Sequence, residues 1–194
     1  MIPPDELLHA YATGIFPMYS SEVGKVQWFS ADPRGIIDLN DYHISKRLLR
    51  YIRNSKYTIS FDQSFEKVIN YCSQIHEEDG VWISNEIIES YINLFNLGFA
   101  HSVEVSSGQK LVAGLYGVAF RGAFFGESMF NLKKHPNTSK IALYYLIQHL
   151  KRQDFFLLDI QMITSTTEQF GAKVISKKEY LTQLNYALTQ DRIF

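Results

Sequence analysis

The fold is decided by residues 100–130, which read AHSVEVSSGQKLVAGLYGVAFRGAFFGESMF. β-Branched and aromatic residues recur in three runs of this stretch, and such residues favour the half-buried surface of a pleated sheet. The runs are separated by SSGQ and by Arg121-Gly122, and both segments suit hairpin turns. The stretch therefore predicts a three-stranded antiparallel meander, with strands at residues 100–105, 110–120 and 123–130.

The segments on either side of the meander predict helices and further strands from the spacing of their apolar residues. Downstream, we expect helices at residues 139–152, 165–170 and 177–190, and strands at 155–161 (FFLLDIQ) and 173–176. Upstream, we expect helices at 4–13, 43–53, 65–75 and 84–97, a strand at 57–61 and two short strands within 26–38. Helices packed on such a sheet make an α+β fold of mixed α/β layers.

The composition is that of an ordinary globular chain of 194 residues, with 46% hydrophobic and 20% charged residues. Because the net charge is -1, any contact with nucleic acid must rest on cations gathered locally. The single cysteine, Cys72, excludes an internal disulfide and fits a reducing compartment. No apolar run of about 18 residues and no signal peptide is found, so we expect a cytoplasmic protein that does not span a membrane.

Segments distributed over most of the chain carry a family resemblance. They read GIFPMYS (14–20), WFSADPRGII (28–37), HISKRLLR (43–50), VWI (81–83), AHSVEV (100–105), LVAGLYGVA (111–119), FFGESMF (124–130), TSKIAL (138–143), LLDIQ (157–161) and FGAKVISKKEYL (170–181). In their order and spacing they resemble the leucyl/phenylalanyl-tRNA–protein transferases. The resemblance implies a GNAT-like acyltransferase domain, which we place at residues 61–194, and a reduced N-terminal subdomain at residues 1–60.

The resemblance also implies a reaction, the aminolysis of an aminoacyl ester. Leu, Phe or Met would pass from its tRNA to the N-terminal Arg or Lys of an acceptor protein, as in the N-end rule pathway. Because the ester is already activated, we expect no cofactor and no metal. The protein, which we expect to be a monomer, must supply orientation, help with proton transfer and donors for the developing oxyanion.

The strand FFLLDIQ carries the candidate catalytic pair, Asp159 and Gln161. Side chains at i and i+2 of a strand share a face, so these two project together while Leu158 and Ile160 point the other way. Taken alone, the pattern favours two solvated polar groups at a strand end. The resemblance implies instead that Asp159 polarises or deprotonates the attacking amine, assisted by Gln161.

Three further residues are candidates for holding the terminal adenosine of the tRNA. Glu127 lies in an apolar strand, where an unpaired carboxylate is costly to bury, so it should face a wet cleft, accept hydrogen bonds or lie on an exposed edge. The resemblance implies that Glu127 and Trp82 hold the adenosine, and a base stacked on an aromatic ring contributes about 1–3 kcal/mol. Met18 stands where the family has a second tryptophan, and Thr166 where it commonly has a histidine.

The remaining site predictions concern the amino-acid cargo and the tRNA backbone. By resemblance, an apolar cargo pocket is formed by Leu115, Phe124, Leu143, Leu146 and Leu158, although each residue taken singly reads as core. Lys46, Arg50 and Arg53 fall on one side of a predicted helix, where they form either a solvated face or a contact for tRNA phosphates. The resemblance favours the phosphate contact.

Two alternative functions remain open on sequence grounds. One is a divergent aminoacyl-tRNA-dependent transferase with another cargo or acceptor, which the changes at Met18 and Thr166 keep open. The other is a non-catalytic domain that binds aminoacyl-tRNA or an N-degron. Retention of Asp159, Gln161 and Glu127 argues against the non-catalytic domain.

Overall fold

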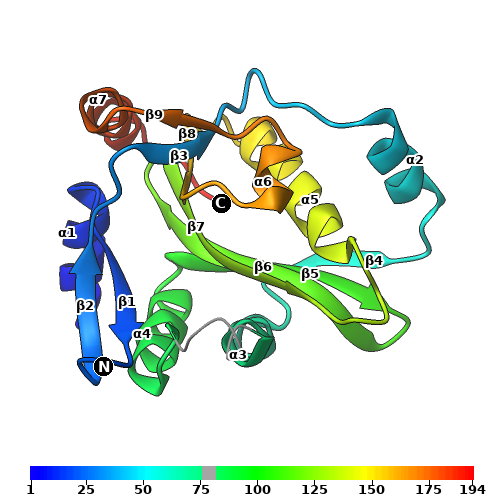
Figure 1. Ribbon diagram of the computed structural model, residues 1–194, viewed down its shortest axis with the longest axis horizontal. Coiled ribbons are helices and arrows are strands. Elements are labelled where there is room, and N and C mark those ends of the chain that lie inside the picture. Colours follow the sequence, from blue (N-terminus) through cyan, green and yellow to red (C-terminus); the bar gives the residue numbers. More distant parts are fainter. Residues whose placement is uncertain (76–81) are drawn as a thin grey trace.

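A computed structural model of the chain describes residues 1–75 and 82–194 (Figure 1). Its centre is a seven-stranded mixed sheet in the order β4-β5-β6-β7-β8-β3-β9. These strands are β3 (Arg34–Ile37), β4 (Thr58–Phe61), β5 (Ala100–Ser107), β6 (Lys110–Phe120), β7 (Ala123–Asn131), β8 (Leu157–Gln161) and β9 (Lys173–Ile175). A separate hairpin is formed by β1 (Phe16–Ser20) and β2 (Lys25–Phe29).

Helices cover both faces of the large sheet. They are α1 (Pro4–Ala12), α2 (Lys46–Asn54), α3 (Phe65–Ile75), α4 (Asn85–Asn96), α5 (Thr138–Arg152), α6 (Ser165–Glu168) and α7 (Lys177–Leu188). α5 packs on β5, β6 and β7, and α2 lies on the same side, whereas α3 and α4 cover the opposite face (Figure 1). Within the described ranges, every helix is too short or too polar to cross a lipid bilayer.

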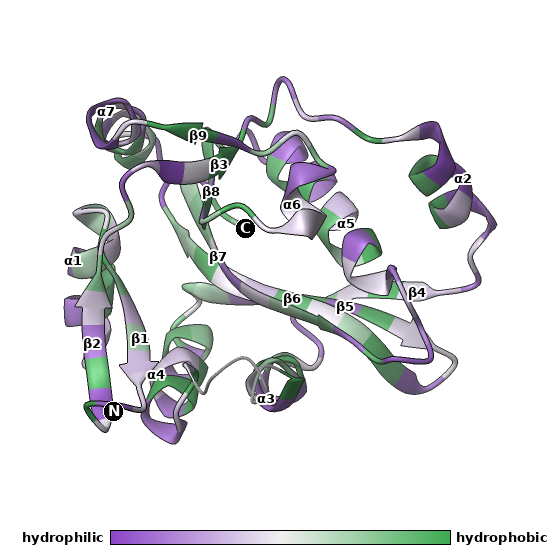
Figure 2. Ribbon diagram, viewed as in Figure 1, coloured by the Kyte–Doolittle hydropathy of each residue, from purple (hydrophilic) through white to green (hydrophobic). Residues whose placement is uncertain are grey.

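Two apolar clusters result, one on each face of the sheet. Successive residues of a strand point to opposite faces, so Phe124 joins the cluster beneath α5 while Phe125 joins the cluster beneath α3 and α4. The helices complete the clusters with their inward sides. α7, for example, turns Tyr180, Leu184 and Ala187 inward and hydrophilic residues outward (Figure 2).

The predicted meander and the mixed α/β layer fold are confirmed, and so is the GNAT-like arrangement, in which α5 connects the last meander strand to the parallel strand β8. The helix predicted from residue 43 begins instead at Lys46, because the Ser45 hydroxyl accepts a hydrogen bond from the backbone N–H of Leu48 and caps it. β1 was not predicted, because Pro17 reads as a strand breaker. Since β1 pairs with β2 alone, proline can occupy this edge strand.

The strands of the N-terminal part belong to two different sheets. β1 and β2, which follow α1 within residues 4–29, form the separate hairpin, whereas β3 and β4 belong to the large sheet. The division into units at 1–60 and 61–194 stays a prediction.

The parallel strands β7 and β8 pair only where they begin, at Ala123–Phe125 and Leu157–Asp159. Just beyond this pairing, β7 contains a bulge: Gly126 pairs with Gly117 of β6 and Ser128 with Tyr116, which leaves Glu127 as the extra residue. A bulge bends a strand and re-aims the side chain of the extra residue. The bulge brings β7 close to Gly117, which has no side chain. A Cβ at this position would lie 2.3 Å from the carbonyl oxygen of Phe125.

Candidate active site

A cavity of about 470 Å³ lies between β7 and β8, beyond the point where their pairing ends. Its walls come from β6, β7, β8 and α5, with further residues from the loop after β8 and from α6. The size is typical of a small-molecule site, for which roughly 300–1,000 Å³ is usual. The separation of β7 and β8 therefore leaves a largely apolar cavity that a ligand can enter.

Six of the predicted site residues line this cavity. They are Trp82, Leu115, Glu127, Leu143, Leu146 and Leu158. Phe124 does not line it: its side chain is fully buried in the cluster beneath α5, with its ring stacked on Phe194 at 5.4 Å between centroids. Thr166, at the position where the family commonly has a histidine, also borders the cavity.

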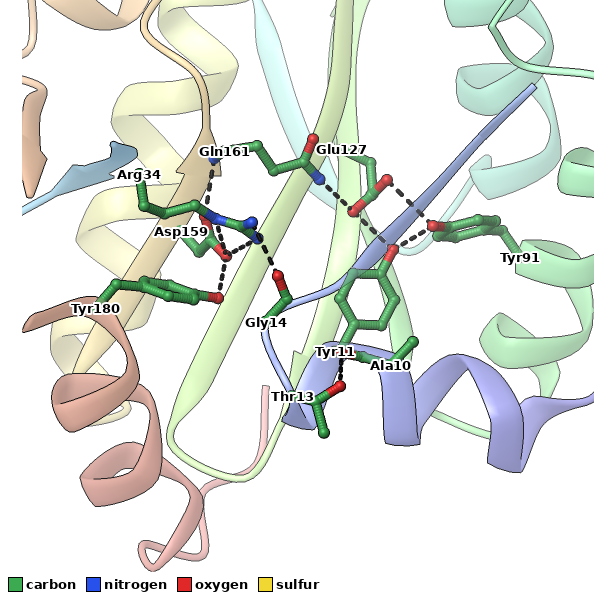
Figure 3. A network of polar contacts seen from close by, with 10 residues as sticks. All are labelled: Ala10, Tyr11, Thr13, Gly14, Arg34, Tyr91, Glu127, Asp159, Gln161 and Tyr180. Carbon is green, nitrogen blue, oxygen red and sulfur yellow. Dashed lines mark hydrogen bonds and ion pairs between the residues drawn. The ribbon is translucent and has the colours of Figure 1, made fainter. Parts of the chain in front are cut away.

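Glu127 is held at the cavity wall by three donors from three different elements (Figure 3). The Tyr11 hydroxyl of α1 and the Gln161 Nε2 of β8 donate to Oε1, at 2.7 Å and 3.0 Å. The Tyr91 hydroxyl of α4 donates to Oε2 at 3.1 Å, and the hydroxyls of Tyr11 and Tyr91 also contact each other. The carboxyl group is thus fixed in one orientation.

The environment of Glu127 favours its protonated form. Burial raises the pKa of this carboxyl group to about 7, although hydrogen bonds from Tyr11 and Tyr91 oppose the increase. Burial and the neighbouring carboxylate of Glu127 also raise the pKa of both tyrosines well above the usual value, so their hydroxyls stay protonated donors.

Asp159 points away from the cavity, toward Arg34 of β3 and Tyr180 of α7 (Figure 3). Arg34 donates from Nε to Oδ1 at 2.9 Å and from Nη2 to Oδ2 at 2.7 Å, which is the bidentate geometry of a strong ion pair. The Tyr180 hydroxyl adds a third bond at 2.7 Å. Both charged side chains are almost completely buried, with relative exposures of 1% and 0%.

Gln161 links the two carboxylates. Its backbone N–H donates to Asp159 Oδ1 at 2.8 Å, while its side-chain amide donates to Glu127. The backbone of Gln161 has φ +60°, a conformation that non-glycine residues adopt infrequently and that is found at functional sites. Leu158 and Ile160 line the cavity instead, so the strand alternates as expected.

The other predicted site residues lie outside the cavity. Met18 of β1 is partly buried against the apolar cluster that also contacts Trp82, and the backbone N–H of Tyr19 donates to the carbonyl of Trp82 at 2.9 Å. Lys46, Arg50 and Arg53 are exposed on α2. Arg50 also borders a second, more open cavity, together with Arg47 and Lys56.

Sequence reasoning missed Arg34, Tyr11, Tyr91 and Tyr180. Arg34 could have been noticed, because it lies in the charged turn of WFSADPRGII. However, nothing in that segment indicates a partner 125 residues away. The tyrosines follow apolar helical spacing, which predicts burial and not hydrogen bonding. Across residues 1–75 and 82–194, no group of three or more His, Cys, Asp or Glu side chains is arranged to hold a metal ion.

The site combines a largely apolar cavity, at the split between two parallel strands, with a carboxylate–amide network along its wall. Family comparison gives the class of enzyme. The profile described as leucyl/phenylalanyl-tRNA protein transferase matches residues 36–185, and the profile of the N-terminal domain of the same enzymes matches residues 1–32. The chain belongs to the leucyl/phenylalanyl-tRNA protein transferase family and is an enzyme of the aminoacyltransferase type.

Similar proteins agree with this assignment. The leucyl/phenylalanyl-tRNA–protein transferase of Anaeromyxobacter sp. (strain Fw109-5) is 42% identical over 189 residues, which cover 96% of this chain and 79% of that protein. The enzyme of the same name from Pelodictyon phaeoclathratiforme (strain DSM 5477 / BU-1) is 42% identical and covers 100% of both chains. A solved conserved protein of unknown function from Bacteroides thetaiotaomicron VPI-5482 shares the fold alone, with a TM-score of 0.54, 10% identity and coverage of 84% and 58%.

Proposed function

We propose that the protein transfers Leu, Phe or Met from its tRNA to the N-terminal Arg or Lys of acceptor proteins, as a monomer acting in the N-end rule pathway. Family membership supports transfer from an aminoacyl-tRNA to a protein. The observation that carries the choice of cargo is the cavity, whose wall contains Leu115, Leu143, Leu146 and Leu158.

Such a wall accepts apolar side chains as a class. A hydrophobic pocket discriminates by only about 1–3 kcal/mol per methylene, so Leu, Phe and Met should all enter. A charged cargo side chain would lose its hydration wherever it meets the lining leucines, because these leucines offer no hydrogen bonds. The cavity therefore favours apolar over charged aminoacyl-tRNAs.

The tRNA is proposed to meet the protein at two places. Its terminal adenosine would pack on Trp82, which borders the same cavity, with Glu127 and Met18 nearby in the fold. The phosphates of its stem would contact Lys46, Arg50 and Arg53 on α2, where the exposed cations favour phosphate without reading bases.

Gln161 and Asp159 are proposed to orient the acceptor amine. Nε2 of Gln161 is turned to Glu127, and its Oε1 points away from this contact (Figure 3), so the oxygen can accept a hydrogen bond from the amine. Asp159, held by Arg34 and Tyr180, fixes the backbone N–H of Gln161. Asp159 would then polarise the amine indirectly, through the position of Gln161.

A transfer assay tests this function. Purified protein is mixed with tRNA charged with radiolabelled Leu, Phe, Met or Arg, and with a peptide that begins with Arg or with its N-acetylated form. We expect label on the free peptide from the Leu, Phe and Met tRNAs, and none from Arg-tRNA or on the acetylated peptide. A peptide that begins with Glu tests whether the acceptor must begin with a basic residue.

The other results separate the alternatives. Transfer only with another cargo, or only to the peptide beginning with Glu, contradicts the proposed specificity and identifies a divergent transferase. Binding of aminoacyl-tRNA without transfer under any condition contradicts catalysis and identifies a binding domain.

A further inference from the structure

We propose that Glu127 accepts the proton that the attacking amine loses and returns it to the 3′ oxygen of the departing tRNA, a role that rests on the proposed function. Among the described residues that line the cavity, Glu127 is the one carboxylate. The bulge at Glu127 interrupts the β6–β7 ladder at the point where β7 leaves β8, and bulges beside active sites commonly re-aim a side chain.

The two carboxylates of the network differ in their capacity to take a proton. A carboxylate has about four acceptor positions. At Asp159 these are filled by Arg34 Nε, Arg34 Nη2, the Tyr180 hydroxyl and the backbone N–H of Gln161, and the side chain is 0% exposed. At Glu127 three donors are present, so one position on Oε2 remains.

The groups that face Glu127 also allow it to titrate in the working range. They are the hydroxyls of Tyr11, Tyr91 and Tyr116, the carboxylate of Asp159 and the guanidinium of Arg34. Burial raises the pKa of Glu127 to about 7, and a general base works best when its pKa lies near the operating pH. Asp159 adds to the increase, and Arg34 opposes it.

The proposed step is balanced. The neutral amine attacks the ester carbonyl, a C–N bond forms, and one N–H proton passes to Glu127. When the bond between the carbonyl carbon and the 3′ oxygen breaks, the same proton passes to that oxygen. The products are an amide and a free ribose hydroxyl, and Glu127 is again a carboxylate.

The test is the pH dependence of kcat/KM for the acceptor peptide, measured with Leu-tRNA. In the unaltered enzyme, both the amine, with a pKa of roughly 8, and Glu127 must be deprotonated, so log kcat/KM should rise with a slope approaching two below about pH 6.5. In Glu127→Gln, which keeps the size of the side chain, the slope should fall to one. The plateau should fall on the order of 10²-fold or more.

Matched variants separate this role from others. Glu104→Gln removes another buried, hydrogen-bonded carboxylate, on β5, and should keep the slope of two. Glu127→Asp keeps a carboxylate and should be slower with the slope retained, so it remains informative if Glu127→Gln does not fold. A slope of one for Glu127→Asp would overturn the proposal.

Two other results for Glu127→Gln would also overturn it. One is a plateau within threefold of the unaltered enzyme with a slope of two. The other is a raised KM for Leu-tRNA with the slope of two retained, which would assign Glu127 to adenosine binding alone. A failure of the proposed function is distinguishable from these results, because in that case the unaltered enzyme itself transfers no label.

Discussion

Replacing Arg34 by methionine tests whether the buried ion pair holds the site together. The substitution keeps most of the apolar stem but removes the guanidinium that donates to Asp159 at 2.7–2.9 Å. It also removes a hydrogen bond from Nη1 to the carbonyl of Gly14 at 3.1 Å. Asp159 would remain completely buried, with hydrogen bonds from the Tyr180 hydroxyl and the backbone N–H of Gln161 but no cation.

The expected loss is large. Removing one partner of a buried ion pair costs about 3–5 kcal/mol, because the remaining charge is left without compensation. With an m-value of roughly 2 kcal/mol per molar urea, the midpoint of unfolding should fall by roughly 1.5–2.5 M. Urea titration at pH 7, followed by circular dichroism, measures this change.

Two further variants make the result specific. Arg121→Met removes an arginine that pairs with Asp191 at 2.7 Å on the surface, where both groups are exposed, so it should cost less than about 1 kcal/mol. The double variant Arg34→Met with Asp159→Leu removes both buried charges and should be more stable than Arg34→Met alone. Equal midpoints for Arg34→Met and Arg121→Met, or additive losses in the double variant, would refute this reasoning.

Two other predictions follow from the fold and the surface. Gly117→Ala should destabilise the protein by about 1–3 kcal/mol in thermal or urea unfolding, because its Cβ would lie 2.3 Å from a carbonyl oxygen of β7. Gly126→Ala is the control, since its Cβ has only an ordinary contact at 3.4 Å, and equal losses would contradict the close approach. Charge reversal at Arg50 and Arg53 should weaken tRNA binding and flatten its dependence on salt, by about 0.7–0.9 in slope for each phosphate that is no longer neutralised. Reversal at the exposed Lys178 of α7 should change neither quantity, and unchanged binding in the α2 variant would count against the tRNA contact there.

Local sequence determined most of the elements and the family. The meander, the helix from Phe65 to Ile75 and the serine cap before α4 follow from apolar spacing and turn residues, which act over a few residues. The motifs were sufficient to identify the family, because their order and spacing are properties of the sequence itself. The resemblance also pointed to four leucines that line the cavity, whereas periodicity alone indicates only that each of them is buried.

Tertiary structure alone decided which polar groups meet and which carboxylate can exchange a proton. Asp159 meets Arg34 from 125 residues away, and Glu127 meets Tyr11 from 116 residues away. Phe124 lies in the core, and Glu127 lies in a bulge that no local pattern marks. The physical reason is that a buried charge must find its partners in whichever elements the packing brings beside it, and periodicity carries no information about partners so distant in sequence.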